Sequence, residues 1–413
     1  MRRLLRNRDF AVYWAGSTVS LLGDGVYFVA LAWQVYSLSN TPQALAYAGV
    51  AWMLPQLAGL LFAGAVSDRF DRRRIMIAAN ALSGLAIGSI GVLSILGKLT
   101  LWQLWLLVAV HGLGVAFFMP AAGAFVPELV SRDMLVEANA LRQFVRPLTM
   151  RLLGPALGGV IVAVLGAGQA FVVDAFSFFF AVAAFALIRH RSSARPPVQS
   201  RRLMEDIAEG LRFVVSQDWL WLSLLAASVW LLIYVGPLEV LLPFLVKNKI
   251  GASARGLGFV YAAGGLGAMI FAFAVARRGL PRRALALMYA VWSLCMFALA
   301  SLALATALWQ AMLASFVVFG LLSTGEIVWQ TQLQRRVPNH LLGRVGSVDW
   351  FSSTLLVPIS FLLTGPIAAA LGAATTLFAA GILGGIMMAA FIALPAIRAS
   401  EPAQPPQLAR AQA

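Results

Sequence analysis

The sequence predicts an all-α integral membrane protein whose twelve transmembrane helices form two parallel repeats of six. Three observations favour this fold class. Hydrophobic residues make up 61% of the 413 residues and charged residues only 11%, and the mean hydropathy is +0.85, whereas a soluble domain is about half apolar and a quarter charged. Long apolar stretches recur along the chain, and the segments between them are alternately rich and poor in basic residues.

Each apolar stretch has about 20 residues or more, which is enough to cross a hydrocarbon core of roughly 30 Å as a helix. The stretches are rich in Ala, Leu and Gly and lack the period-2 alternation of a barrel strand, so they predict helices. In chain order they cover approximately residues 10–36, 44–66, 75–96, 101–122, 140–164, 168–188, 219–246, 256–276, 284–304, 308–331, 346–370 and 373–396.

The formal net charge of +15 would suggest nucleic acid as the partner of a soluble protein, but its distribution indicates a membrane. The tails and loops on the N-terminal side of the membrane hold 24 Lys and Arg residues, the opposite side holds 4, and the fifth span holds 3. By the positive-inside rule, both termini are expected in the cytoplasm of a multi-pass protein of the inner (plasma) membrane. The lipid bilayer is then a partner, and nucleic acid is not.

The longest polar interval, residues 189–219, separates the first six spans from the last six. We therefore expect an N-terminal half at 1–188, a cytoplasmic central loop at 189–218, a C-terminal half at 219–398 and a cytoplasmic tail at 399–413. Within the loop, Leu203, Ile207, Leu211 and Val214 fall on one helical stripe, which predicts an amphipathic helix on the inner leaflet.

The two halves resemble each other. "LVSRDMLVEANAL", after the fourth span, lies 207 positions before "RVPNHLLGRVGSV", after the tenth. Six spans in each half bring both ends of a half to the same side of the membrane. The repeats are therefore parallel, and a substrate path is expected between them.

These features resemble the major facilitator superfamily over essentially the whole chain. More narrowly, "LLGDGVYFVAL", "DRFDRRR", "VPELVSRDMLVEANAL" and "RLLGPALGG" look like the drug and siderophore exporters of that superfamily, which include macrolide, tetracycline and enterobactin efflux proteins. Two positions depart from the family pattern, which usually has glycine where this chain has Asp71 and Met150. The residues that carry the superfamily resemblance are Gly64, Asp68, Arg69, Arg72 and Arg73 in the loop after the second span, and Gly154, Pro155, Gly158 and Gly159 in the fifth span.

Three carboxylates inside the spans are candidates for proton coupling or substrate binding, because ionisable groups are costly at the centre of a bilayer. Asp24 lies midway through the first span between two glycines, and Glu239 lies in the seventh between two prolines that would free backbone carbonyls. Glu326 and Gln330 share a face of the tenth span, where they face the cavity or only anchor a helix. The alternative for Asp24 is a structural carboxylate, and for Glu239 a position near the outer interface.

Basic residues in the fifth span complete this set. Arg142 and Arg146 are four residues apart on one face, whereas Arg151 is expected to point elsewhere, because five residues turn an α-helix by about 140°. Arg151 either pairs with an intramembrane acid such as Asp24 or Asp174, which we favour, or contacts an anionic substrate.

The glycine-rich run "GPALGG" combines a missing helix hydrogen bond with a smooth packing surface. In the family this element marks antiporters, which implies exchange of a proton for the exported compound. The alternative is an ordinary kinked packing helix.

The loop after the second span has a further implied role. The resemblance implies that Asp68, at the end of the second span, meets the N-terminal end of the eleventh span and latches the two halves while the cavity faces outward. The equivalent loop of the second half offers Arg277 and Arg278 but no acid, so only one such latch is expected.

Several classes are excluded by what the sequence lacks. It has no phosphate-binding loop of the G-x-x-x-x-G-K-[ST] type, no H-E-x-x-H motif, and a single cysteine, so we expect no enzyme, no cofactor and no metal site. The sequence therefore predicts a monomeric, proton-coupled secondary transporter that exports drugs or other small amphipathic compounds by alternating access. The alternatives are an importer, a lysophospholipid or siderophore transporter of the same fold, and a receptor or scaffold that does not transport.

Overall fold

A computed structural model describes residues 4, 6–131, 134–190, 200–281, 283–338, 340–395 and 397. Within these ranges the side chains of 61, 65, 68, 136, 140, 143 and 200–207 are not described. The predicted tail at 399–413 lies outside the described residues. The four predicted domain limits stay a prediction.

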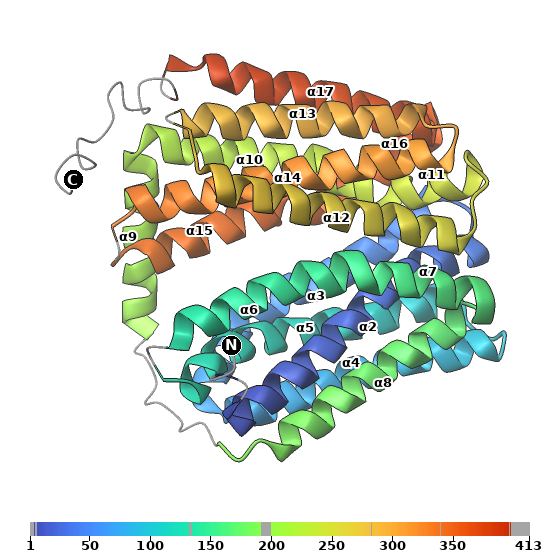
Figure 1. Cartoon of the computed structure of the whole chain (residues 1–413), viewed down its shortest axis with the longest axis horizontal. Coiled ribbons are helices and arrows are strands. Elements are labelled where there is room, and N and C mark those ends of the chain that lie inside the picture. The colour runs from blue at the N-terminus through green and yellow to red at the C-terminus, as the bar shows by residue number, and fades with distance from the viewer. Residues whose placement is uncertain are drawn as a thin grey trace.

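The described part of the chain folds into helices, which gather in two bundles that lie one above the other in Figure 1. The first bundle contains α2 (Arg8–Leu38), α3 (Pro42–Arg69), α4 (Arg72–Ile95), α5 (Leu101–Leu129), α6 (Leu135–Pro147), the π-helix η2 (Leu148–Leu153), α7 (Gly154–Leu165) and α8 (Ala167–Leu187). The second contains α10 (Asp218–Gly236), the π-helix η3 (Pro237–Leu241), α11 (Leu242–Asn248), α12 (Ala254–Arg278), α13 (Ala284–Leu304), α14 (Leu308–Arg336), α15 (Leu342–Leu355), α16 (Val357–Leu371) and α17 (Ala373–Ala393).

These helices match the predicted spans. Eleven helices or joined helices of the described part are long and apolar enough to cross a membrane, and the 28-residue α3 occupies the place of the second predicted span. Three spans are divided: the fifth into α6, η2 and α7, the seventh into α10, η3 and α11, and the eleventh into α15 and α16. The π-helices follow or begin at prolines, which cannot donate the backbone hydrogen bond that a regular helix needs.

The bundles touch mainly where α7 meets α12 and where α3 meets α16. At the end opposite the N-terminus they are fastened by hydrogen bonds. The Tyr36 hydroxyl donates to the Val240 carbonyl at 2.6 Å, and the Lys247 ammonium donates to the Tyr36 carbonyl at 2.5 Å. The Asn40 and Asn248 amides also pair at 2.6 Å. The halves are therefore closed together at the face predicted to be outside.

Helix α9 (Ser200–Ser216) runs across the ends of the bundle helices at the face where α2 begins (Figure 1). It packs on α15, where Arg344 donates to Glu209 at 2.6 Å. Of the predicted apolar stripe, Val214 is buried and Leu211 is half exposed, while the side chains of Leu203 and Ile207 lie outside the described residues. This placement agrees with an amphipathic helix along the membrane surface.

Candidate functional site

A cavity of about 850 Å³ lies between the two bundles. We call it the central cavity. Its walls come from α2 to α8 of the first bundle and from η3, α12, α14 and α15 of the second. The ionisable side chains that line it, other than tyrosines, are Asp24, His111, Arg142, Arg146, Arg151 and Glu239.

Asp24 is half-buried at the wall of this cavity. The glycines on either side let neighbouring helices approach α2 closely. A Cβ at Gly25 would lie 2.8 Å from Gly154 Cα, and one at Gly23 would collide with the side chains of Asp174 and Ser177. Gly23 and Gly25 pack against other helices, so of these three residues Asp24 is the one that lines the cavity. Asp24 makes no ion pair with any described residue.

Glu239 enters the same cavity from the second bundle. It lies on η3, which begins at Pro237. The carbonyl of the adjacent Val240 accepts the hydrogen bond from Tyr36 across the bundle interface. Glu239 therefore lines the cavity instead of lying at the outer interface.

The orientation predicted for Arg151 was wrong. Arg146 and Arg151 both line the central cavity together with Arg142. The reason is η2, because residues five apart come to the same side of a helix whose hydrogen bonds join residues i and i+5. Arg151 pairs with neither Asp24 nor Asp174. Its guanidinium instead lies 4.9 Å from the ring centre of Phe319 in the second bundle.

Other intramembrane acids lie away from the cavity. Gln330 donates to Glu326 at 3.1 Å, as the spacing predicts, but both side chains are exposed and neither is among the residues that line the cavity, which favours the alternative that the pair anchors a helix. Asp349 accepts a hydrogen bond from the Trp329 indole at 3.1 Å. Asp174 is fully buried inside α8 and accepts from Ser177 at 3.2 Å.

The sequence did not single out most of the uncharged residues that line the central cavity. Trp14, Tyr27, Trp52, Gln56 and His111 line the cavity, and each has a buried polar atom without a hydrogen-bond partner among the described residues. An unsatisfied buried polar atom costs about 1–3 kcal/mol, so these atoms would gain a partner if the cavity wall rearranged around a ligand. Span position alone could have indicated Trp52 and His111, but not which way they face.

The glycine-rich run of the fifth span joins three helices. Gly154 and Gly158 pack against α2, where added Cβ atoms would lie 2.6 Å from Gly25 Cα and 2.8 Å from Val26 Cα. Gly159 faces α12 of the other bundle, where an added Cβ would lie 2.9 Å from Gly258 Cα. Pro155 lines the cavity at the start of α7. The run therefore lies where the two bundles meet.

The loop after α3 is anchored within the first bundle. Buried Arg72 forms an ion pair with Glu128 of α5, and Arg73 Nε donates to the Phe185 carbonyl of α8 at 2.7 Å. Asp71 caps α4 by accepting from the Arg73 amide at 2.9 Å, which explains an acid where the family has glycine. Gly64 and Arg69 are exposed, and the side chain of Asp68 lies outside the described residues.

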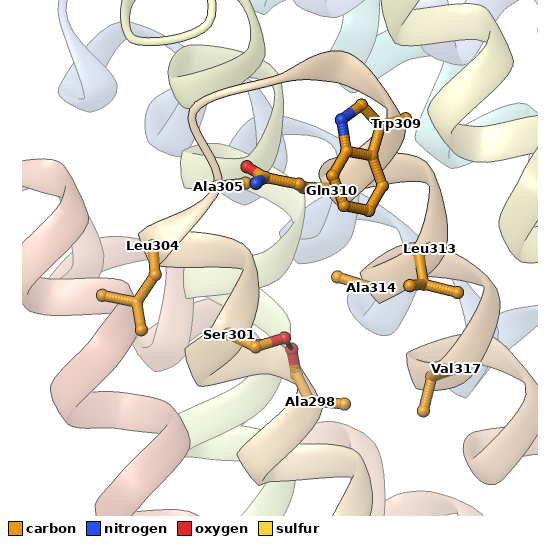
Figure 2. Close-up of a pocket in the computed structure, with 9 residues that line it drawn as sticks. All are labelled: Ala298, Ser301, Leu304, Ala305, Trp309, Gln310, Leu313, Ala314 and Val317. Carbon is orange, nitrogen blue, oxygen red and sulfur yellow. Dashed lines mark hydrogen bonds between the residues drawn. The ribbon is translucent and has the colours of Figure 1, made fainter.

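A second hollow, of about 440 Å³, lies outside the central cavity between α13 and α14. Figure 2 shows that Ser301 and Gln310 are the polar side chains among its lining, and the rest are apolar, with Trp309 near one end. Trp309 and Leu304 are largely exposed. Such a surface suits lipid chains better than a polar substrate. In the described ranges no three His, Cys, Asp or Glu side chains gather in a group that could hold a metal ion.

The two-bundle helical fold with a central cavity fits a membrane transporter, and residues 4–411 match the family model described as transmembrane secretion effector. The chain belongs to this family of major facilitator transporters, which are not enzymes.

Relatives that align with most of this chain are named as efflux proteins. The chain is 28% identical over 414 residues to the multidrug efflux pump Tap of Mycolicibacterium fortuitum, covering 96% of this chain and 97% of that protein. It is 22% identical over 369 residues to macrolide efflux protein A of Streptococcus pyogenes, covering 88% and 90%.

Solved structures share the fold. A bacterial homologue of the iron transporter ferroportin in an inward-facing state matches with a TM-score of 0.70 at 16% identity, covering 95% of this chain and 100% of that one. A D-xylose–proton symporter matches with a TM-score of 0.71 at 14% identity, covering 97% and 100%.

Proposed function

We propose that this transporter is a proton-coupled antiporter that exports small amphipathic compounds by alternating access. The observation that carries the proposal is the carboxyl of Asp24, which lines a cavity shared by both bundles and has no ion pair among the described side chains. A carboxyl that gains a proton on one side and loses it on the other can couple transport to the membrane potential, which supplies about 2.3 kcal/mol per charge per 100 mV. The efflux names of the relatives support export as the direction.

Glu239 and Arg151 supply two further charges of the site. Glu239 brings a second carboxyl from the second bundle, so a compound between Asp24 and Glu239 would contact both halves. The halves must then separate at the fastened end to release it. The loop after α3, which includes Asp68, would latch the two halves together in the outward-facing state.

The orientation belongs to the same proposal. The cavity extends toward the face where α2 begins, since Tyr13, Trp14 and Arg142 line it. Among the described basic residues that predict a cytoplasmic location, Arg8 begins α2 and Arg344 pairs with Glu209 of α9 at that face. The chain would therefore lie in the plasma membrane with both termini in the cytoplasm and take up its cargo from the cytoplasmic side. We propose that it acts as a monomer, since one chain supplies both bundles that line the cavity.

The test uses everted vesicles with an imposed pH gradient. Asp24→Asn should abolish gradient-driven transport of a panel of dyes and antibiotics that includes a macrolide, because the amide cannot carry the proton. Protein levels in the membrane should stay normal. Glu326→Gln is the control, since it removes an intramembrane acid that does not line the cavity. Full coupled transport by Asp24→Asn would reject the assignment.

A further inference from the structure

The central cavity has an excess of positive charge. Three arginines line it, Arg142, Arg146 and Arg151, against the two carboxyls of Asp24 and Glu239. None of the three guanidinium groups has an ion pair or a hydrogen bond to the described part of the chain. Three positive charges minus two negative charges leave one in excess, and protonation of either acid leaves two.

The local helix geometry brings these arginines together. Arg142 and Arg146 lie one turn apart on α6, and η2 returns Arg151 to the same side five residues later. Since each places its charge at the wall of one cavity, the three would repel one another. Two carboxyls do not balance three guanidinium groups in the same cavity, so the remaining positive charge favours the entry of an anion.

Arg151 is held in a way that leaves its donors available. Its guanidinium carbon lies 4.9 Å from the centre of the Phe319 ring, and its N–H groups make no hydrogen bond to the described part of the chain. The planar fork of N–H donors matches the two oxygens of a carboxylate, sulfonate or phosphate. The cavity volume of about 850 Å³ falls in the range of pockets that enclose drug-sized ligands.

We propose that Arg142, Arg146 and Arg151 form a subsite for an anionic group, carboxylate, sulfonate or phosphate, on the amphipathic compound that this protein transports. Phe118 and Phe319, which also line the cavity, contact its apolar part. This proposal rests on the proposed function only in assuming that the bound compound is transported. The anion subsite itself is tested by binding alone.

The experiment uses two dyes with the same aromatic rings, of which only one carries a sulfonate: 8-anilinonaphthalene-1-sulfonate and N-phenyl-1-naphthylamine. Saturable binding is measured to the full-length protein in nanodiscs without a proton gradient, after subtraction of protein-free nanodiscs. Arg151→Gln should weaken binding of the sulfonate dye about tenfold or more, as expected for loss of a charge-assisted hydrogen bond. Binding of the uncharged dye should change less than twofold, which also reports that the variant is folded.

Arg277→Gln is the matched control. Arg277 also lies over an aromatic ring, at 4.5 Å from the centre of Phe273, but it is exposed at the end of α12 and does not line the cavity. Its substitution should leave binding of both dyes unchanged. The proposal is overturned if Arg151→Gln leaves binding of the sulfonate dye unaffected, or if it weakens binding of both dyes equally.

Competition separates the two sources of an anionic group. Displacement of the sulfonate dye by 1-naphthoate supports a soluble anionic cargo, whereas displacement by lysophosphatidylglycerol alone assigns the same arginines to a lipid headgroup. Displacement by neither overturns the proposal. Because no gradient is applied, a failure of Asp24→Asn to stop transport would reject the proton site and leave the anion subsite standing.

Discussion

Arg69 and Arg72 lie three residues apart in the family's loop motif, yet their surroundings differ. Arg69 is exposed, whereas Arg72 is only 5% exposed and forms an ion pair with Glu128. The loop motif therefore contains at least one residue that holds the first bundle together, independently of any latch between the bundles.

Arg72→Gln is expected to destabilise the protein by about 3 kcal/mol, because it leaves the mostly buried Glu128 carboxylate without this counter-charge. Thermal unfolding in detergent would measure the change. The nearby Arg69→Gln should shift stability by less than about 0.5 kcal/mol, since its side chain is exposed. Equal stability of the two variants would contradict a structural role for Arg72.

Among the intramembrane charges, neighbouring side chains decide the role of each residue. Asp24 and Asp174 are both carboxyls inside spans, but Asp24 lines the cavity while Asp174 is fully buried beside Gly23. Their sequence contexts are similarly apolar. The packing of α2 against α8 leaves Asp24 at the cavity, where it can carry a proton, and buries Asp174 as a polar contact between the helices.

At the scale of elements, α7 and α12 form a contact of glycine on glycine between the two bundles. A Cβ at Gly159 would lie 2.7 Å from the Ala254 carbonyl oxygen and 2.9 Å from Gly258 Cα. Helices that pack this closely can slide past one another without side chains interlocking. The contact is therefore suited to a joint that persists while the bundles rock.

Gly159→Leu is expected to force α7 away from α12, because the obstructing atoms are backbone. Overpacking of this kind costs about 1–3 kcal/mol, and transport should be lost even where the protein still reaches the membrane. Gly123→Leu in α5 is the control, since a Cβ at Gly123 meets nothing within 4 Å. Vesicle transport together with membrane protein levels would check both. Wild-type transport by Gly159→Leu would disprove a joint at this contact.

At the scale of the whole molecule, the structure is fastened at one end and hollow toward the other. The fastened end includes the Asn40–Asn248 pair, and the cavity extends toward the opposite face. Alternating access requires the fastened end to open once in each cycle.

A double variant, Asn40→Cys with Asn248→Cys, tests this requirement. Because the two side chains hydrogen-bond at 2.6 Å, a short bifunctional thiol reagent should join them and stop transport, and a reductant should restore it. The native Cys295 is buried and should not react. Each single-cysteine variant treated alike is the control. Continued transport after complete cross-linking would show that this end need not open.

The sequence by itself determined the membrane class, the positions of the spans, the division into two sets of six and the family. These follow from apolar length, from the distribution of basic residues and from local motifs, all of which are independent of helix orientation. The sequence also located Asp24 and Glu239 as candidates, because charge inside a span is rare enough to stand out.

Only the tertiary structure decided which charges share the cavity. The spans are apolar on nearly all sides, because both lipid and neighbouring helices accept apolar residues, so periodicity does not indicate which face is inside. For this reason the sequence left both orientations of Glu326 open, and the structure places it outside the cavity lining. The expected direction of Arg151 was wrong because a π-helix changed the local turn, and whether its side chain contacts an acid or a ligand depends on residues far away in the chain.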